Sequence, residues 1–167
     1  MARRPPPIWI LLLAVVLAYG AVSVALVRLL RLPESFTVAP WLAWSAGGGL
    51  VVLGMTLLGL AIRHLSLRRA FGTEIYAPAA ESVLVTSGPY ASVRNPLYLG
   101  ATVALIGWTL LLRSVVLAIA TGLMVIHFAF VARWEERELL SRFGEAYEAY
   151  RRVTPRFLPR PGGVRRK

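Results

Sequence analysis

Two short polar motifs stand at the two ends of one long apolar stretch. The first, residues 88–98, reads GPYASVRNPLY, and the second, residues 134–136, reads WEE. An arginine beside the free amides at a helix start favours a carboxylate or a phosphate, and paired glutamates accept hydrogen bonds from hydroxyl or ammonium groups. The motifs therefore suit a ligand with an acidic end, a cationic end and sugar hydroxyls. The candidate side chains are Tyr90, Arg94, Asn95 and Tyr98 in the first motif and Glu135 and Glu136 in the second.

The apolar stretch from Leu97 to Ala132 must fold back on itself. As one helix it would be roughly 54 Å long, against a hydrocarbon core of about 30 Å. Residues 113–114, Arg-Ser, are the polar place near its middle. The stretch therefore predicts a tight hairpin of two spans, about 97–112 and 115–132. Asn95 suits the N-cap of the first of these helices, and Pro96 suits its first helical position.

The composition indicates an integral membrane protein. The chain is 57% hydrophobic with a mean hydropathy of +0.63, and two further apolar runs, about 8–27 and 41–62, are long enough to span a bilayer. We expect one all-α domain, residues 1–167, with four transmembrane helices and a cytoplasmic C-terminal helix. The small residues 45–49, SAGGG, would let a neighbouring helix approach closely.

The basic residues indicate the orientation. If both termini and the 63–96 loop share one side, that side holds 16 of the 19 Lys and Arg residues. By the positive-inside rule both termini are then cytoplasmic, and we expect a bacterial inner (plasma) membrane. The apolar run after Arg3-Arg4 is longer than the apolar segment of a signal peptide, which favours a retained helix. The basic tail, Arg156 to Lys167, suits anionic lipid headgroups better than nucleic acid.

The fourth helix is expected to continue beyond the membrane. Leu139, Phe143, Tyr147 and Tyr150 repeat at helical spacing and form one apolar stripe. The chain has no Cys, and neither its two histidines nor its glutamates have metal-ligand spacing, so we expect no metal. No nucleophile–base constellation is visible either.

Both motifs resemble the signature of the isoprenylcysteine carboxyl methyltransferases and related bacterial membrane methyltransferases. The similar residues are LVTSGPY at 84–90, RNPLYLG at 94–100, and Glu135-Glu136, Leu139, Phe143-Gly144, Tyr147 and Tyr150. The resemblance covers about residues 80–159 and is more distant for phospholipid N-methyltransferases. It implies S-adenosylmethionine as cofactor. The residues it implies at the cofactor are Ser82, Val83, Leu84, Val85, Tyr90, Asn95, Pro96, Leu97, Tyr98, Gly100, Glu135 and Glu136.

Two positions depart from the family pattern. The family usually has His at the position of Asn95, and Asn cannot be protonated. In the eukaryotic enzymes an Arg four residues before the cofactor glutamate holds the substrate, and here that position is Val131. Arg133 is near in sequence but about 200° away around the helix. The resemblance therefore implies neither a protonated side chain at position 95 nor a substrate-binding Arg at position 131.

Arg94 and His127 are the candidate catalytic residues. Arg94 could instead contact lipid headgroups with a snorkelling side chain. His127 is the only ionisable residue deep in a predicted span, and such residues usually face a cavity or a partner. It lies about 12 Å from Glu135 along the same helix. It could therefore line a substrate tunnel or make an interhelical hydrogen bond.

These observations predict a membrane methyltransferase that uses S-adenosylmethionine. The methyl acceptor is expected to be a lipophilic or lipid-modified molecule entering from the bilayer, and the resemblance implies carboxyl O-methylation of isoprenylcysteine-like substrates. Membrane lipids are the other expected partners. Three alternatives stay open: a phosphatidylethanolamine-type N-methyltransferase, a non-catalytic protein with the same fold, and an NADPH-dependent reductase. The last has no glycine fingerprint for a dinucleotide in this chain.

Overall fold

The computed structural model describes residues 8–65 and 83–159, with side chains from residue 14 onward. The described part is helical and contains no strand, only an isolated bridge between Ser35 and Ser114. The helices are α1 (Ile8–Leu29), α2 (Pro40–Leu42), η1 (Ala43–Gly47), α3 (Gly48–Leu65), α5 (Pro89–Ser92), α6 (Pro96–Leu112), α7 (Val115–Phe143) and α8 (Glu145–Val153).

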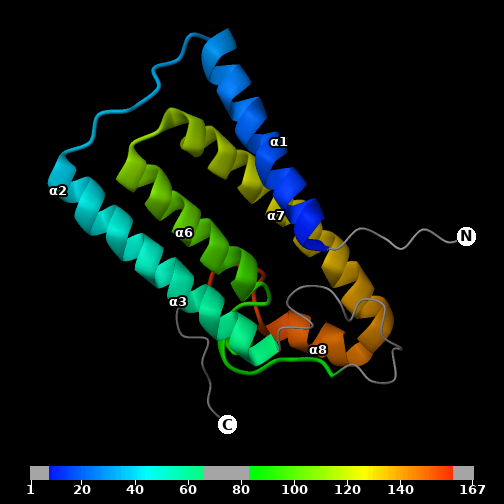
Figure 1. Ribbon diagram of the computed structural model, residues 1–167. Helices are drawn as coiled ribbons and strands as arrows, with labels where there is room; N and C mark the ends of the chain where they lie inside the picture. Colours follow the sequence, from blue (N-terminus) through cyan, green and yellow to red (C-terminus); the bar gives the residue numbers. More distant parts are fainter. Residues whose placement is uncertain (1–7, 66–82, 160–167) are drawn as a thin grey trace, which may run out of the picture.

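The long helices lie side by side in an order that differs from their order in the chain. α6 lies between α3 and α7, and α1 packs on the outer side of α7 (Figure 1). α2, η1 and α3 follow one another without interruption, and the π-helical turn η1 was not expected from the sequence. The end of the bundle where α6 begins and α7 ends carries both polar motifs. We use the term motif end for it.

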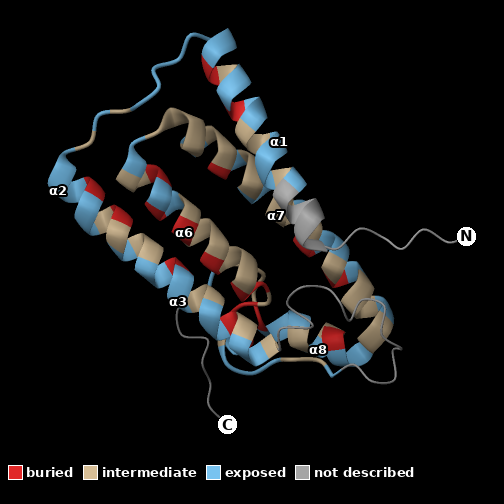
Figure 2. Ribbon diagram, viewed as in Figure 1, coloured by how far each residue is buried: buried red, intermediate tan, exposed pale blue. Residues whose placement is uncertain are grey.

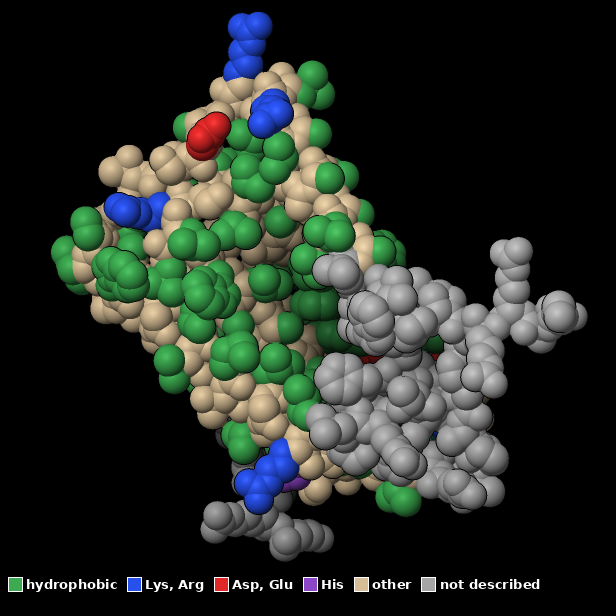
Figure 3. Space-filling model, viewed as in Figure 1, with side chains coloured by type: hydrophobic (Ala, Val, Ile, Leu, Met, Phe, Trp, Pro, Cys, Tyr) green, Lys and Arg blue, Asp and Glu red, His purple; other side chains and the backbone are tan. Residues whose placement is uncertain are grey.

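The helices match the predicted spans in position. Two of them are long and apolar enough to cross a membrane, Pro40–Leu65 and Val115–Phe143, and two shorter apolar helices are Ala14–Leu29 and Pro96–Leu112. Their outward faces are exposed (Figure 2), with large apolar side chains such as Trp44, Val52 and Phe130 uncovered. Apolar side chains cover the side of the bundle, and the Lys and Arg side chains visible there lie toward its ends (Figure 3). Such an apolar band suits a lipid environment.

Glycines bring α3 and α6 close together. A Cβ at Gly54 would collide with the backbone of Ala104, and one at Gly107 would lie 2.7 Å from the Gly47 carbonyl oxygen. Gly47 therefore belongs to the helix contact that the small residues predicted. A Cβ on Gly48 or Gly49 would meet nothing within 4 Å, so these two residues are not part of it.

The connection between α6 and α7 is two residues long, as predicted. Arg113 adopts the left-handed conformation (φ 49°) and ends α6, and the Ser114 hydroxyl accepts a hydrogen bond from the Leu117 amide at 3.3 Å. The loop after α1 is tied to this turn, because the Phe36 amide donates to the Arg113 carbonyl at 3.0 Å. The helices also meet through Thr109 and Thr121, whose hydroxyls are 3.0 Å apart.

The last helical part differs from the prediction of one continuous helix. α7 ends at Phe143, and Gly144 has φ 50° and ψ −124°, a conformation that is essentially restricted to glycine. α8 then starts at Glu145 and crosses the motif end (Figure 1). The predicted stripe is therefore split between two helices, and Tyr147 on α8 is almost fully buried.

Candidate active site

The first motif is held at the motif end by glycine geometry and by the segment that follows α8. Gly88 has φ 60°, and a side chain there would collide with the ring of His64 from α3. The chain then makes the short helix α5 and turns into α6. The Arg94 amide donates to the Pro155 carbonyl at 2.8 Å, and the Asn95 amide donates to the Arg156 carbonyl at 3.1 Å. Two distant parts of the sequence therefore run together beside the start of α6.

Tyr98 and Glu135 join the two motifs directly. The Tyr98 hydroxyl donates to Glu135 Oε1 at 2.7 Å, and the Tyr98 ring stacks on Phe128 with the centroids 5.0 Å apart. No hydrogen bond within the described residues involves Glu135 Oε2. Glu135 is therefore oriented by one donor and keeps a carboxylate oxygen for another.

Glu136 is the centre of a buried ion cluster. Arg156 binds it with two hydrogen bonds, Nε to Oε1 at 2.8 Å and Nη2 to Oε2 at 2.6 Å, and Arg94 Nη2 lies 3.4 Å from Oε1. Burial alone would raise the pKa of Glu136, but the hydrogen bonds from Arg156 and the charge of Arg94 lower it below its ordinary value. The same contact raises the pKa of Arg156. Both groups therefore stay charged and hold the segment after α8 against the first motif.

Asn95 occupies the predicted N-cap position of α6, with Pro96 after it, but its side chain makes no capping hydrogen bond. Its amide nitrogen instead lies 3.4 Å from Glu136 Oε1 and 3.4 Å from the Arg156 carbonyl oxygen. The amide nitrogen donates toward these two oxygens, and the side-chain oxygen accepts no hydrogen bond from the first turn of α6. Asn95 is thus a member of the Glu136 cluster.

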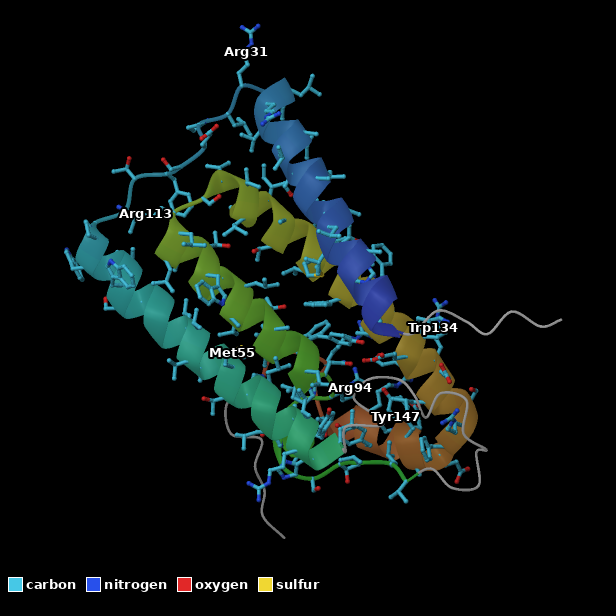
Figure 4. All side chains as sticks on the ribbon, in the orientation of Figure 1. Arg31, Met55, Arg94, Arg113, Trp134 and Tyr147 are labelled. Carbon is cyan, nitrogen blue, oxygen red and sulfur yellow. The ribbon has the colours of Figure 1, made fainter. Side chains whose placement is uncertain are left out.

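Several buried donors at the motif end have no hydrogen-bond partner in the described part of the chain. They are the hydroxyls of Tyr90 and Tyr147 and the Nε and Nη1 atoms of Arg94. Arg94 and Tyr147 lie near each other between the start of α6 and α8 (Figure 4). Burial raises the pKa of Tyr147 to about 12 and that of Tyr90 further, so both hydroxyls keep their protons. Unpaired buried donors cost roughly 1–3 kcal/mol each, which a ligand rich in oxygen acceptors would recover.

Comparisons with known proteins identify the family of this chain. A family model described as phospholipid methyltransferase matches residues 42–146. The chain belongs to the phospholipid methyltransferase family. The match reaches from the end of α2 into α8 and so includes nearly all of the second predicted span, which the sequence resemblance had left outside.

Three relatives of this family member each match roughly two thirds to three quarters of the chain. The protein-S-isoprenylcysteine O-methyltransferase of Schizosaccharomyces pombe is 34% identical over 113 residues, 64% of this chain and 48% of the relative. The enzyme of that name from Rattus norvegicus is 32% identical over 130 residues, 74% of this chain and 44% of the relative. The cobalt-zinc-cadmium resistance protein CzcN of Cupriavidus metallidurans is 36% identical over 115 residues, 66% of this chain and 50% of the relative. The chain spans about half the length of these relatives, and no solved structure gives a match.

In this family member most of the predicted site residues come together at the motif end. Tyr90 is joined to α8, because the Tyr150 hydroxyl donates to the Tyr90 carbonyl at 2.6 Å. Pro96 and Leu97 form the first turn of α6. Val83, Leu84 and Val85 precede α5 without regular secondary structure, and Ser82 lies outside the described residues.

Two predicted residues have other surroundings. Gly100 faces α3, where a Cβ would lie 2.8 Å from the Leu58 amide nitrogen, so it contributes to the close packing of α6 against α3. His127 Nδ1 lies 3.1 Å from the Tyr19 hydroxyl of α1. This is the interhelical hydrogen bond that was the alternative to a tunnel-lining role.

The alternative surface role of Arg94 and the expected surface role of Arg156 do not agree with the structure. The Arg94 side chain is only 10% exposed and pairs with Glu136, so it does not snorkel to headgroups. Arg156 was assigned to the lipid-facing tail, and it is instead the main partner of Glu136. No spacing in the sequence signals this pair, because it depends on how the segment after α8 returns to the first motif.

Proposed function

We propose that this chain is a four-span membrane methyltransferase that uses S-adenosylmethionine and acts on a lipophilic or amphiphilic acceptor. The observation that carries the proposal is the convergence of unpaired donors and Glu135 at the motif end, within the residues that the family model matches. The charge distribution supports the cytoplasmic side for this end, because the two termini and the 63–96 loop, which we assign to that side, carry 16 of the 19 Lys and Arg residues.

The residues at the motif end fit the polar groups of S-adenosylmethionine. Arg94, with two buried unpaired nitrogen atoms, suits the methionine carboxylate. Glu135, held by Tyr98, has an acceptor for ribose hydroxyls or the ammonium group. The Tyr90 hydroxyl adds a donor beside them. Glu136 has both carboxylate oxygens engaged by Arg156, so we assign it to holding the site together instead of to the ligand.

The chemistry requires few titratable side chains. When bound, S-adenosylmethionine supplies an activated methyl group for in-line displacement. The chain would contribute alignment and exclusion of water, for which apolar helices are well suited. A carboxylate acceptor needs no general base. His127 bonds the Tyr19 hydroxyl of α1 through Nδ1, and we propose that its ring also lies on the acceptor side of the site, so that the two expected roles are combined.

Carboxyl O-methylation of an isoprenylcysteine-like acceptor is the favoured reaction, because the relatives from Schizosaccharomyces pombe and Rattus norvegicus carry that name. Phospholipid N-methylation is the second candidate, and the description of the family model favours it. In the first reaction a carboxylate oxygen of the acceptor would take the methyl group as the bond from the methyl carbon to the sulfonium sulfur breaks, and S-adenosylhomocysteine would leave. In the second, an amine nitrogen does so and loses a proton afterwards.

A methyl-transfer assay distinguishes the two reactions. Purified protein in nanodiscs receives methyl-labelled S-adenosylmethionine with either an N-acetylated prenylcysteine or phosphatidylethanolamine. A carboxyl methyl ester releases volatile methanol in base, whereas an N-methyl group is stable. We expect base-labile label with the prenylcysteine, reduced about tenfold or more in Glu135→Ala, which removes a cofactor hydrogen bond.

Glu138→Ala is the matched control, because Glu138 lies one turn further along α7 and pairs with Arg142 at 3.6 Å. Its methylation rate should stay within about twofold of the wild-type rate. Base-stable label with phosphatidylethanolamine would support N-methylation instead. Label in neither acceptor, from folded protein that binds S-adenosylhomocysteine, would contradict both acceptor classes.

A further inference from the structure

A second polar pocket lies between α7 and α8. It has a volume of about 230 Å³ and is lined by Arg133, Glu136, Arg137, Leu140, Arg151 and Arg156. Along α7, positions 133, 136, 137 and 140 share one helix face, and Glu135 lies about 160–200° around the helix from Arg133 and Arg137. The pocket therefore faces away from the side of α7 that contacts Tyr98.

The pocket has an excess of positive charge. Its one carboxylate, Glu136, is already bound by Arg156 with two hydrogen bonds, and Arg151 pairs with Glu148 at 2.9 Å. Among the described residues, Arg137 has no ion-pair or hydrogen-bond partner, and Arg133 contacts only the ring of Phe130, with its Cζ 6.0 Å from the ring centroid. Two guanidinium groups are thus available for an anion, and guanidinium groups bind phosphate oxygens well.

An exposed apolar stripe leads into the pocket from the membrane side. Ile126 and Phe130 are 56% and 62% exposed, and with Arg133 and Arg137 they repeat at steps of four, three and four residues. They therefore lie on one face of α7. Trp134, 57% exposed, projects from α7 away from Arg94 and Tyr147 (Figure 4), as aromatic residues do at a membrane surface. Apolar side chains followed by free arginines match an acyl chain followed by a phosphate.

We propose that this pocket binds the phosphate of an anionic phospholipid, with the acyl chains along Ile126 and Phe130. Arg133 and Arg137 bind the phosphate oxygens, and Arg151 and Arg156 keep the pocket positive. The lipid lies on the opposite side of α7 from Glu135, so it is a bound membrane lipid and not the methyl acceptor. This inference does not depend on the proposed function.

Native mass spectrometry of the purified full chain tests the proposal. The protein in detergent is titrated with an equimolar mixture of phosphatidylglycerol and phosphatidylcholine. We expect retention of phosphatidylglycerol about tenfold or more above phosphatidylcholine, because each basic residue adds attraction to an anionic headgroup. The double variant Arg133→Gln/Arg137→Gln should lose this preference, with its affinity for S-adenosylhomocysteine unchanged.

The matched control is Arg28→Gln/Arg152→Gln, which removes the same charge from exposed positions outside the pocket. It should keep the preference. Equal loss in both double variants, or no preference in the wild type, would overturn the site. Displacement of phosphatidylglycerol by millimolar inorganic phosphate would show a soluble phosphate site instead and overturn the lipid assignment. If the double variant unfolds, Arg137→Gln alone serves, because its side chain has no partner in the described residues.

Discussion

Adjacent carboxylates on α7 perform different tasks at the motif end. Glu135 and Glu136 are about 100° apart around the helix, so one meets Tyr98 of α6 and the other meets Arg156 beyond α8. The direction of each side chain, rather than its residue type, decides its role. Glu135 is the candidate ligand group, and Glu136 stabilises the site.

The Tyr98 hydroxyl is expected to orient Glu135 for ligand binding. In Tyr98→Phe the ring still stacks on Phe128, but the 2.7 Å hydrogen bond is lost. We expect the dissociation constant for S-adenosylhomocysteine to rise about five- to tenfold, the effect of one hydrogen bond. Isothermal calorimetry measures this dissociation constant. Tyr19→Phe removes a hydroxyl that bonds His127 instead, and an equal loss in that variant would contradict the role of Tyr98.

Glu136 is expected to stabilise the fold in a pH-dependent way. Its pKa is below its ordinary value of 4.5, so its contribution is complete above that pH and is lost as the pH falls toward the folded-state pKa. Glu136→Gln should cost about 2 kcal/mol at pH 7, as for a hydrogen bond to a charged group.

Thermal unfolding in detergent from pH 7 to pH 3.5 tests this linkage. The difference in Tm between wild type and Glu136→Gln should stay constant down to about pH 5 and shrink below pH 4.5. A difference that is the same at all pH values would show that ionisation of Glu136 does not contribute to stability.

At the scale of single residues, the sequence predicted that the two motifs meet, and Tyr98 and Glu135 are the pair that joins them. It did not predict that Arg156 meets Glu136. The first pair follows from the fold-back of one apolar stretch, whose length alone brings its two ends together. The second depends on the path of residues 154–156 after α8. No local pattern specifies that path, so tertiary contacts had to reveal it.

Among the helices, the α3–α6 contact depends on positions where backbones touch. Gly54→Ala would force a methyl group into the Ala104 backbone, and overpacking typically costs about 1–3 kcal/mol. Gly59 is also on α3, but a Cβ there meets nothing within 4 Å. Gly59→Ala should be neutral or stabilising, since alanine has the higher helix propensity. Thermal unfolding compares the two variants, and equal Tm values would contradict close packing at Gly54.

The sequence predicted helix positions better than helix ends and breaks. The length of the apolar run and the Asn95-Pro96 pair before it are local features, so they predict the position of α6 without knowledge of the neighbouring helices. The break at Gly144 was missed because the stripe from Leu139 to Tyr150 continues across it with helical spacing. The positive φ of Gly144 accompanies the packing of α8 against the motif end. Hydrophobic periodicity along the sequence does not predict this packing.

For the whole molecule, the proposed orientation can be tested by labelling, because the chain has no native Cys. Ser141→Cys, exposed on α7 near the motif end, should react with a membrane-impermeant maleimide only after the inner membrane is opened. Ser35→Cys, exposed in the loop before α2, should react in intact spheroplasts. Labelling of both, or of Ser141→Cys alone, in intact spheroplasts would contradict cytoplasmic termini.

The central claim for the whole molecule is that the motif end binds S-adenosylmethionine through Glu135. Isothermal calorimetry of the purified protein with S-adenosylhomocysteine tests it most directly. We expect a dissociation constant on the order of micromolar, about −8 kcal/mol, weakened at least tenfold by Glu135→Ala and unchanged by Glu138→Ala. Absence of binding in a folded sample, or equal binding by Glu135→Ala and the wild type, would contradict the account.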